Sequence, residues 1–305
     1  MGKILLFYKY VDIEYPKQVQ KWQQKLCADL GLTGRIIIAH EGINATVGGS
    51  EQHLEIYKKA MAKDPRFTGI DFKESEGGAH CFPRMRIIVK NEIVYLGLDP
   101  QKVTAKNSGQ HLTPEQTHNL IASKPNDLVI LDARNDYEWR IGAFQNAIKP
   151  DIEHFRQFPQ FVDDNLEQFK DKQVIMYCTG GIRCERASSY LKEKGVAKNV
   201  YQISGGIHRY VEQYPDGFFR GKNYVFDDRI GVRVNADILS TCNLCPTPCD
   251  DYTNCLNAEC NAHYIACVPC IEKYGNACSA QCQELLATNK VKPRPERNVV
   301  SACQL

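Results

Sequence analysis

The residues with the clearest potential for chemistry surround Cys178, which follows four apolar residues and precedes a loop with two adjacent glycines. The apolar run is typical of a short buried strand. A pattern of apolar and small residues at helical spacing begins at Cys184 and ends at Gly195, a residue that favours helix ends. A strand, a loop and a helix in this order direct several backbone N–H groups at one point. That environment favours a thiolate over a thiol, so we expect Cys178 to be reactive and partly exposed.

The length of this loop limits the size of the group that it can bind. Only four residues separate Cys178 from Arg183, one fewer than a cysteine phosphatase needs to wrap a phosphate. A smaller group, such as a persulfide or another single-atom adduct on the sulfur, is therefore expected to fit. A buried structural cysteine is the commoner fate of a lone thiol, but the glycine pair and the arginine favour the reactive interpretation. The candidate active-site loop is Cys178, the catalytic residue, followed by Thr179, Gly180, Gly181, Ile182, Arg183 and Cys184.

A second group of residues suited to chemistry is a dense block of cysteines near the C-terminal end. Residues 242–282 hold nine of the 14 cysteines, whereas residues 1–241 hold four. This density on an otherwise ordinary chain favours metal binding over a disulfide framework. The spacing predicts two tetrahedral sites in an interleaved cross-brace. The first would use Cys242, Cys245, Cys267 and Cys270, and the second would use Cys255, Cys260, Cys278 and Cys282.

Zinc suits these thiolates best, because a soft, closed ligand set is typical of a structural zinc ion. An iron–sulfur cluster and disulfides formed during purification stay open as alternatives. A segment with so few large aliphatic residues needs such a cross-link to fold. Cys249 and Cys303 lie outside the pairing and receive no role.

The elements that must position these residues fall into three parts. The first part has strand and helix patterns in the order β-α-β-β-α-β, which is the split βαβ pattern of a ferredoxin-like α+β fold. Strands are expected at residues 3–11, 35–39, 43–47, 70–72 and 86–89, and helices at residues 16–30 and around 54–61. His40 and Glu41 fall at a turn where nothing nearby completes a catalytic set, so they are interpreted as surface or substrate-contact residues.

The second part alternates strand and helix patterns, which predicts a parallel α/β sheet covered by helices. Ligands bind beyond the carboxyl ends of such strands, and Cys178 follows one directly. The predicted domains of this α/β multidomain chain are residues 1–98, a catalytic domain at 108–220, and a connector with the small cysteine-rich zinc module at 221–305.

Several motifs resemble those of the rhodanese family. The loop around Cys178 resembles its active-site loop, and three more segments agree at the right spacing: residues 112–115, residues 131–134 with Glu138, Gly142 and Ala147, and residues 202–206. Residues 36–49 also resemble the acylphosphatase-like N-terminal domain of one rhodanese subgroup. In a rhodanese-like fold, Asp132 and Arg134 are more often a structural ion pair than substrate contacts.

The three parts in this order resemble the oxygen-dependent tRNA uridine hydroxylase family, from about Lys3 to Cys282. The resemblance implies an oxidoreductase that converts the wobble uridine of tRNA, position 34, to 5-hydroxyuridine. It also implies molecular oxygen as a co-substrate, the anticodon loop of tRNA as the partner, and Cys178 as the essential cysteine. No flavin, haem or non-haem iron triad is recognisable in the sequence.

Two other function classes stay open. A sulfurtransferase would carry sulfane sulfur on Cys178, and the loop alone supports it equally well. A non-catalytic adaptor would bind a partner through the rhodanese fold, but the complete loop argues against it. An enzyme that grips a folded tRNA needs extra surface, so we expect the N-terminal domain and the cysteine-rich end to flank the mouth above Cys178. Cys184 is either a resolving thiol or, as we favour, a small buried residue that starts the helix.

Charge and composition set limits on partners and location. The formal net charge of +2 excludes a protein that coats nucleic acid, but it allows a local basic patch. No run approaches the roughly 18 apolar residues of a membrane span, and the start lacks the features of a signal peptide. A reactive thiol calls for a reducing compartment, so we expect a cytoplasmic protein; no oligomeric state is predicted. Two segments suggest RNA contacts, residues 82–86 and the basic tail with Lys290, Lys292, Arg294 and Arg297.

Overall fold

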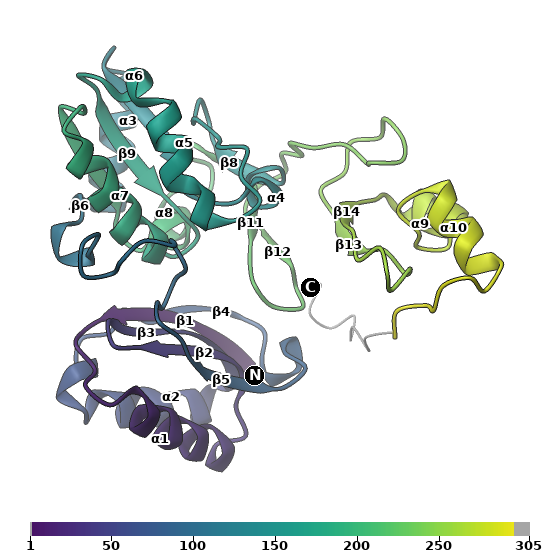
Figure 1. Ribbon diagram of the computed structural model, residues 1–305, viewed down its shortest axis with the longest axis horizontal. Coiled ribbons are helices and arrows are strands. Elements are labelled where there is room, and N and C mark those ends of the chain that lie inside the picture. The colour runs from purple at the N-terminus through teal and green to yellow at the C-terminus, as the bar shows by residue number, and fades with distance from the viewer. Residues whose placement is uncertain (1, 296–305) are drawn as a thin grey trace.

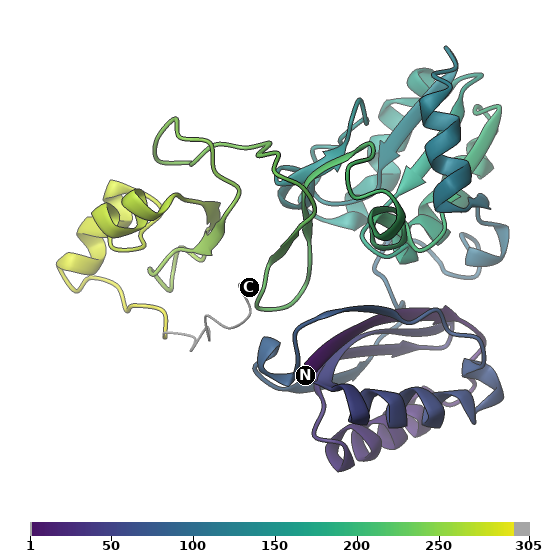
Figure 2. The ribbon, with the colours of Figure 1, turned by 180° about the vertical axis from the view of Figure 1, so that it is seen from behind.

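The computed structural model describes residues 2–295, which form three parts along the chain (Figure 1). An N-terminal sheet with two helices lies beneath a central α/β part, and a small cysteine-rich part lies to one side, joined by extended segments (Figures 1 and 2). None of the helices in this described range is long and apolar enough to cross a membrane.

The N-terminal part is a five-stranded sheet in the order β4-β1-β3-β2-β5, with β5 parallel to β2. Its strands are β1 (Gly2–Tyr10), β2 (Thr33–Ala39), β3 (Gly42–Ser50), β4 (Lys73–Glu76) and β5 (Met85–Val89). Helices α1 (Pro16–Asp29) and α2 (Glu51–Ala62) cover one face, and short 3-10 turns lie at η1 (Pro65–Phe67) and η2 (Ala79–Cys81). The first four strands have the expected ferredoxin-like order, and β5 extends it. The strand expected at residues 70–72 begins later, at Lys73.

Alternation along the strands explains why only one face carries helices. On β1, Leu5 and Phe7 are buried in a core with residues of α1 and α2, whereas Leu6 and Tyr8 point to the opposite face. Figure 1 shows this helix-free face turned toward the central part. The side chains on the helix-free face, such as Leu6 and Tyr8, therefore point directly at the central part.

The central part contains a parallel sheet in the order β6-β10-β9-β7. These strands are β6 (Gln110–Leu112), β7 (Leu128–Asp132), β9 (Gln173–Tyr177) and β10 (Asn199–Ile203). Two separate hydrophobic clusters cover the two faces of the sheet, as the α/β prediction requires. The helices are α3 (Pro114–Ala122), α4 (Asp136–Trp139), α5 (Phe158–Asp164), α6 (Leu166–Phe169), α7 (Ile182–Lys194) and α8 (Gly206–Gln213), with 3-10 turns η3 (Ala105–Asn107) and η4 (Phe155–Gln157).

The segment expected to be a plain connector contains strands. β11 (Phe219–Tyr224) and β12 (Gly231–Arg233) join β8 (Gly142–Phe144) in a three-stranded sheet. The proposed boundary between residues 220 and 221 therefore falls inside β11. Strands of this kind escape notice in the sequence because glycine and charged residues interrupt their apolar alternation.

The cysteine-rich part is small, with β13 (Tyr252–Asn254), β14 (His263–Ile265), α9 (Val268–Tyr274) and α10 (Ala280–Ala287). Its interior consists largely of cysteine side chains and a few apolar residues. The expected basic tail belongs to this part up to Arg294, while Arg297 and Cys303 lie outside the described residues.

Candidate active site

Cys178 lies directly after β9, at the carboxyl end of the parallel sheet. The chain then turns through Gly181, whose φ of +101° is a left-handed conformation that glycine adopts without strain. Helix α7 begins at the next residue and carries Arg183 and Cys184 in its first turn. The Gly181 N–H donates a hydrogen bond to the Cys178 sulfur over 3.2 Å. The local structure is the strand, loop and helix that the sequence predicts.

Opposing effects act on the Cys178 thiol. Burial alone would raise its pKa, but a hydrogen bond from Cys184, the positive charge of Arg183 and the backbone N–H groups at the start of α7 outweigh burial. Together they lower the pKa of Cys178 to about 6. Cys178 is therefore mostly a thiolate at neutral pH, which is the form of a nucleophile.

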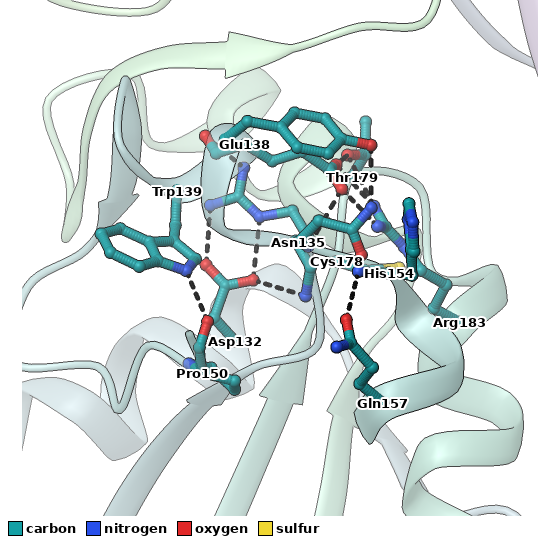
Figure 3. A network of polar contacts seen from close by, with 12 residues as sticks. Asp132, Asn135, Glu138, Trp139, Pro150, His154, Gln157, Cys178, Thr179 and Arg183 are labelled. Carbon is teal, nitrogen blue, oxygen red and sulfur yellow. Dashed lines mark hydrogen bonds and ion pairs between the residues drawn. The ribbon is translucent and has the colours of Figure 1, made fainter. Parts of the chain in front are cut away.

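Arg183 owes its position to Glu138, a fully buried residue in α4. The two side chains form a bidentate ion pair, with Nη2 of Arg183 2.7 Å from Oε2 of Glu138 (Figure 3). The Thr179 hydroxyl also donates to this carboxylate over 3.4 Å. Burial would lower the pKa of Arg183, but Glu138 raises it and keeps the guanidinium charged beside the sulfur. Glu138 belongs to the rhodanese-like motif, yet its role as the partner of Arg183 was not recognisable in the sequence.

Asp132 and Arg134 are both completely buried and form an ion pair, with Nη2 of Arg134 2.7 Å from Oδ2 of Asp132. Arg134 also donates to the carbonyl oxygen of Gly142 over 2.6 Å. These contacts hold the turn after β7 against β8. The pair is structural, as expected.

The N-terminal sheet closes over the loop. A Cβ atom added to Gly180 would lie 2.9 Å from the Leu6 side chain, and one added to Gly181 would lie 2.9 Å from the Tyr8 hydroxyl. The Tyr8 hydroxyl donates to Glu185 over 2.8 Å, which joins β1 to the first turn of α7. Cys178 is completely buried in this arrangement, so the expectation of a partly exposed thiol is wrong. The cover comes from a domain that is distant in the sequence.

A cavity of about 850 Å³ lies between the helix-free face of the N-terminal sheet and the Cys178 loop. Cys178, Thr179, Gly180 and Arg183 line one side of it. The opposite side comes from β1, β2 and β3. The segment after β5, residues 154–156, His208 and residues between Val225 and Arg229 also contribute to the lining. The N-terminal domain flanks the site as expected, but within residues 2–295 no lining residue lies beyond Arg229, so the described cysteine-rich part does not line the cavity.

His208, in the first turn of α8, lines the same cavity and was missed by sequence reasoning. Its backbone N–H donates to the carbonyl oxygen of Thr179 over 3.1 Å. Burial and the nearby charges of Lys73, Arg229 and Arg209 lower the pKa of His208 to about 4. His208 is therefore a neutral imidazole at pH 7. A lone histidine after a glycine pair gives no signal of this position.

Cys184 is completely buried, and burial together with its hydrogen bond to Cys178 raises its pKa well above the usual range. It packs in the core beside Cys178 as a neutral thiol. His40 is exposed, as expected, whereas Glu41 is half-buried and accepts a hydrogen bond from the backbone N–H of Ile93 over 2.8 Å. Glu41 thus holds the chain segment that leaves the N-terminal sheet.

The eight predicted metal ligands gather into two groups of four. Cys242, Cys245, Cys267 and Cys270 form one group, and Cys255, Cys260, Cys278 and Cys282 form the other. Within each group the sulfur atoms lie within 4.8 Å of one another. Ligands about 2.3 Å from a tetrahedral zinc ion are about 3.8 Å apart, so each group is compact enough for its four thiolates to hold one ion. Cys249 lies outside both groups and is buried.

Two segments were expected to contact RNA. In the first, residues 82–86, only some of the side chains are exposed. Phe82 is 8% exposed and packs against Ile4 and Cys81, so its ring cannot stack on a base. Arg84 and Arg86 are exposed. In the tail, Lys290 and Lys292 are exposed, and Arg294 is held by Asn261.

Comparison with known proteins gives three matching family models along the chain. They are the UPF0176 acylphosphatase like domain at residues 2–93, the rhodanese-like domain at residues 113–213 and the rhodanase C-terminal region at residues 220–283. The chain is also 41% identical to the tRNA uridine(34) hydroxylase of Onion yellows phytoplasma, over 92% of this chain and 91% of that one. It is 40% identical to the protein of that name in Staphylococcus saprophyticus and 41% identical to that in Cytophaga hutchinsonii, each over 92% of this chain and 89% of the relative.

Proposed function

The chain belongs to the tRNA uridine(34) hydroxylase family, and we propose that it hydroxylates uridine 34 of tRNA with Cys178 as the reacting thiolate. The observation that carries the role of Cys178 is its depressed pKa, about 6, at the wall of a cavity of about 850 Å³. Ligand cavities in proteins measure roughly 300–1,000 Å³, so this cavity suits a group as large as a nucleoside.

The substrate must present its base to a buried sulfur. A wobble base can enter a pocket only after it leaves the anticodon stack, while the protein holds the backbone outside. The position of Cys178 beneath the N-terminal sheet agrees with that requirement. We therefore propose that the anticodon loop lies over the cavity and that uridine 34 enters it.

Inside the cavity, the thiolate of Cys178 adds to C6 of the uracil, which makes C5 electron-rich and ready for oxidation. One atom of O2 then bonds to C5, and the other is released as water with two electrons from a reductant outside this chain. Loss of the C5 proton expels the sulfur from C6 and restores the C5–C6 double bond. The alternative role for the sulfur is to carry an oxygen or sulfur adduct. The N–H donors of the loop and Arg183 hold negative charge at the sulfur in either case.

The cofactor proposals follow from the same family membership and from the cysteine groups. We propose molecular oxygen as the co-substrate and a zinc ion in each group of four thiols, where it would cross-link the small C-terminal part. A cytoplasmic location is proposed as well, because a reactive thiolate and metal-binding thiols both need a reducing compartment. The domain limits of residues 1–98, 108–220 and 221–305 stay proposals, with the last boundary inside β11.

The proposal is tested by mass spectrometry of tRNA nucleosides from a strain that lacks this gene. The wild-type gene should restore 5-hydroxyuridine and its derivatives, whereas Cys178→Ser should not. Cys249→Ser is the matched control, because Cys249 is buried but does not line the cavity. Full 5-hydroxyuridine formation by Cys178→Ser would refute the role of the thiolate.

The same strains separate hydroxylation from sulfur transfer. A hydroxylase leaves thiolated uridines unchanged when the gene is deleted. A sulfurtransferase would show the opposite pattern, with loss of thiolated uridine and normal levels of 5-hydroxyuridine.

A further inference from the structure

Two large aromatic side chains at the cavity are exposed to solvent. Tyr95, in the segment after β5, is 60% exposed, and Phe226, after β11, is 58% exposed. Among the large exposed apolar side chains of the described residues, only these two line the cavity. They belong to segments that are far apart in the sequence, so two separate parts of the chain each bring one exposed ring to the cavity. Exposed apolar side chains that gather at a ligand cavity, rather than singly over the surface, indicate a binding site.

Phe226 is also linked to the active-site loop. The guanidinium carbon of Arg183 lies 5.8 Å from the centre of the Phe226 ring. The Tyr224 ring also packs edge to face against the Phe226 ring, with the ring centres 5.4 Å apart. The ring is thus held in place and still leaves more than half of its surface open.

Positive side chains surround the same opening. Arg35, Lys90 and Arg156 line the cavity and are exposed, and Arg86 lies beside Arg35 in the register of β2 and β5. Burial and the charge of Arg86 lower the pKa of Arg35, as expected for two neighbouring cations without a counter-charge. Within residues 2–295 the structure forms no ion pair with any of these four side chains. By contrast, Arg183 and Arg229, which also line the cavity, are paired with Glu138 and Asp227.

The helix-free face of the sheet forms a wall of the cavity between these groups. Leu6 and Tyr8 of β1, Ile37 of β2, and Asn44 and Thr46 of β3 line the cavity from its helix-free face. An open sheet face with aromatic and basic residues is a common way to bind single-stranded RNA, because unstacked bases lie flat on rings while cations meet the phosphates. Exposed cations that bind phosphates release the counterions condensed on the nucleic acid, which favours binding.

We propose that Tyr95 and Phe226 stack on the bases that flank uridine 34, and that Arg35, Arg86, Lys90 and Arg156 bind the phosphates of the same loop. We call these six residues the aromatic–cationic rim. This inference rests on the proposed function, since it takes the anticodon loop as the occupant of the cavity mouth. The rim keeps the loop open once the target base has entered the cavity, because each flanking base exchanges its stacking partner for a protein ring.

The aromatic half of the rim is tested by binding of a fluorescently labelled, unmodified tRNA transcript with uridine 34 to the full chain. Tyr95→Ala and Phe226→Ala should each weaken binding about five- to 150-fold, the range for loss of one base–ring stack. Tyr95→Phe and Phe226→Tyr keep a ring and should bind almost as the wild type does. Tyr15→Ala is the matched control, because Tyr15 is 55% exposed but does not line the cavity.

The cationic half predicts a change in salt dependence. Arg35→Gln with Lys90→Gln should weaken tRNA binding and make the plot of log affinity against log salt less steep by about 0.7 for each lost phosphate contact, the value for single strands. Lys21→Gln is the control, since Lys21 is exposed on α1, on the far face of the sheet. Equal binding and equal salt slopes for the rim and control variants would overturn the proposal.

Different results would refute the proposed function and the proposed role of the aromatic–cationic rim. If the wild-type chain restores no 5-hydroxyuridine and binds no tRNA, the proposed function fails. If the wild type binds and modifies tRNA, but the rim variants match Tyr15→Ala and Lys21→Gln in both assays, only the rim is wrong.

Discussion

The reactivity of Cys178 depends on a balance between two effects on one atom. Removal from water disfavours the thiolate, and fixed donors around the sulfur favour it. The donors win because Arg183 is held in place by a buried carboxylate and because the loop amides cannot turn away. The Cys184 thiol adds one more donor from the first turn of α7. Each of these contributions is open to a separate test.

The pKa of Cys178, about 6, predicts how kcat/KM changes on the acid side of its pH profile. Below that pH the sulfur is protonated, so kcat/KM should fall by about tenfold for each pH unit, and above it kcat/KM should level off. Cys184→Ala removes a donor and should move this limb to higher pH, whereas Cys184→Ser keeps a donor and should leave it closer to the wild type. An acid limb that does not respond to Cys184→Ala would contradict the assignment to Cys178.

The buried ion pair of Glu138 and Arg183 predicts a large effect on stability. Glu138→Gln removes the hydrogen-bonded carboxylate partner of this buried guanidinium and leaves only the negative charge of the Cys178 thiolate beside it. Loss of one partner of a buried ion pair typically costs about 3–5 kcal/mol. The free energy of unfolding, from urea titration, should fall accordingly. Asp29→Asn is the comparison, because it breaks the exposed pair of Lys25 and Asp29 and should change stability little. Similar losses for both variants would sink this account.

At the scale of elements, the loop is enclosed between β1 on one side and the start of α8 on the other. Gly206 has a φ of +63°, and a Cβ atom there would clash with the carbonyl oxygen of Cys178 and lie 2.8 Å from the Gly181 nitrogen. These are backbone atoms that cannot move aside without shifting the loop. Helix α8 therefore approaches the active-site loop as closely as glycine alone permits.

Gly195 and Gly206 have almost the same φ, so alanine variants at these two positions distinguish the effect of backbone strain from the effect of steric contact. Gly195, which ends α7, has a φ of +66°, and a Cβ atom added there would meet nothing within 4 Å. Gly195→Ala should cost about 1–2 kcal/mol of stability from backbone strain alone and leave kcat unchanged. Gly206→Ala should cost more and lower kcat, because it displaces the loop. Thermal unfolding and single-turnover rates measure both, and equal effects on kcat would argue against close packing as the cause.

At the scale of the whole molecule, the cavity exists only because two domains meet. Arg209 of α8 pairs with Asp71, and Arg229 donates to the Ser75 hydroxyl and to the backbone of Glu76, so the central part is tied to the edge of the N-terminal sheet. On the other side, stacked rings of Tyr252 and His263 lie against Tyr224, which joins the cysteine-rich part to β11. The eight cysteines of the two thiol groups belong to this attached part and do not line the cavity.

The two groups of thiols predict about two zinc ions per chain. Elemental analysis of freshly reduced protein should find this stoichiometry. Cys242→Ser should lower it to about one, whereas Cys249→Ser, outside both groups, should leave it unchanged. A strong chelator should unfold the cysteine-rich part, because its interior has few apolar side chains other than cysteine. A folded C-terminal part with free thiols and no metal would refute the proposal.

The sequence by itself determined the features that depend on short spacings. The periods of apolar residues predicted the ferredoxin-like order and the parallel sheet, because each element buries one face or stripe. The strand, the glycine loop and the helix around Cys178 followed from adjacent residues. The spacing of the cysteines also predicted which four thiols come together, because paired ligands on short turns leave few alternatives.

Only the tertiary structure decided how the site is enclosed. Tyr8 meets Glu185 across 177 residues, and no local pattern in either segment encodes that contact. The same packing buries Cys178, which the sequence suggested would be partly exposed, and creates the cavity with Tyr95 and Phe226 at its lining. The packing of the domains also determines which basic side chains at the cavity form ion pairs and which do not. These properties arise from surfaces of separate domains that fit together, so they follow from the fold as a whole and not from the spacing of residues along the chain.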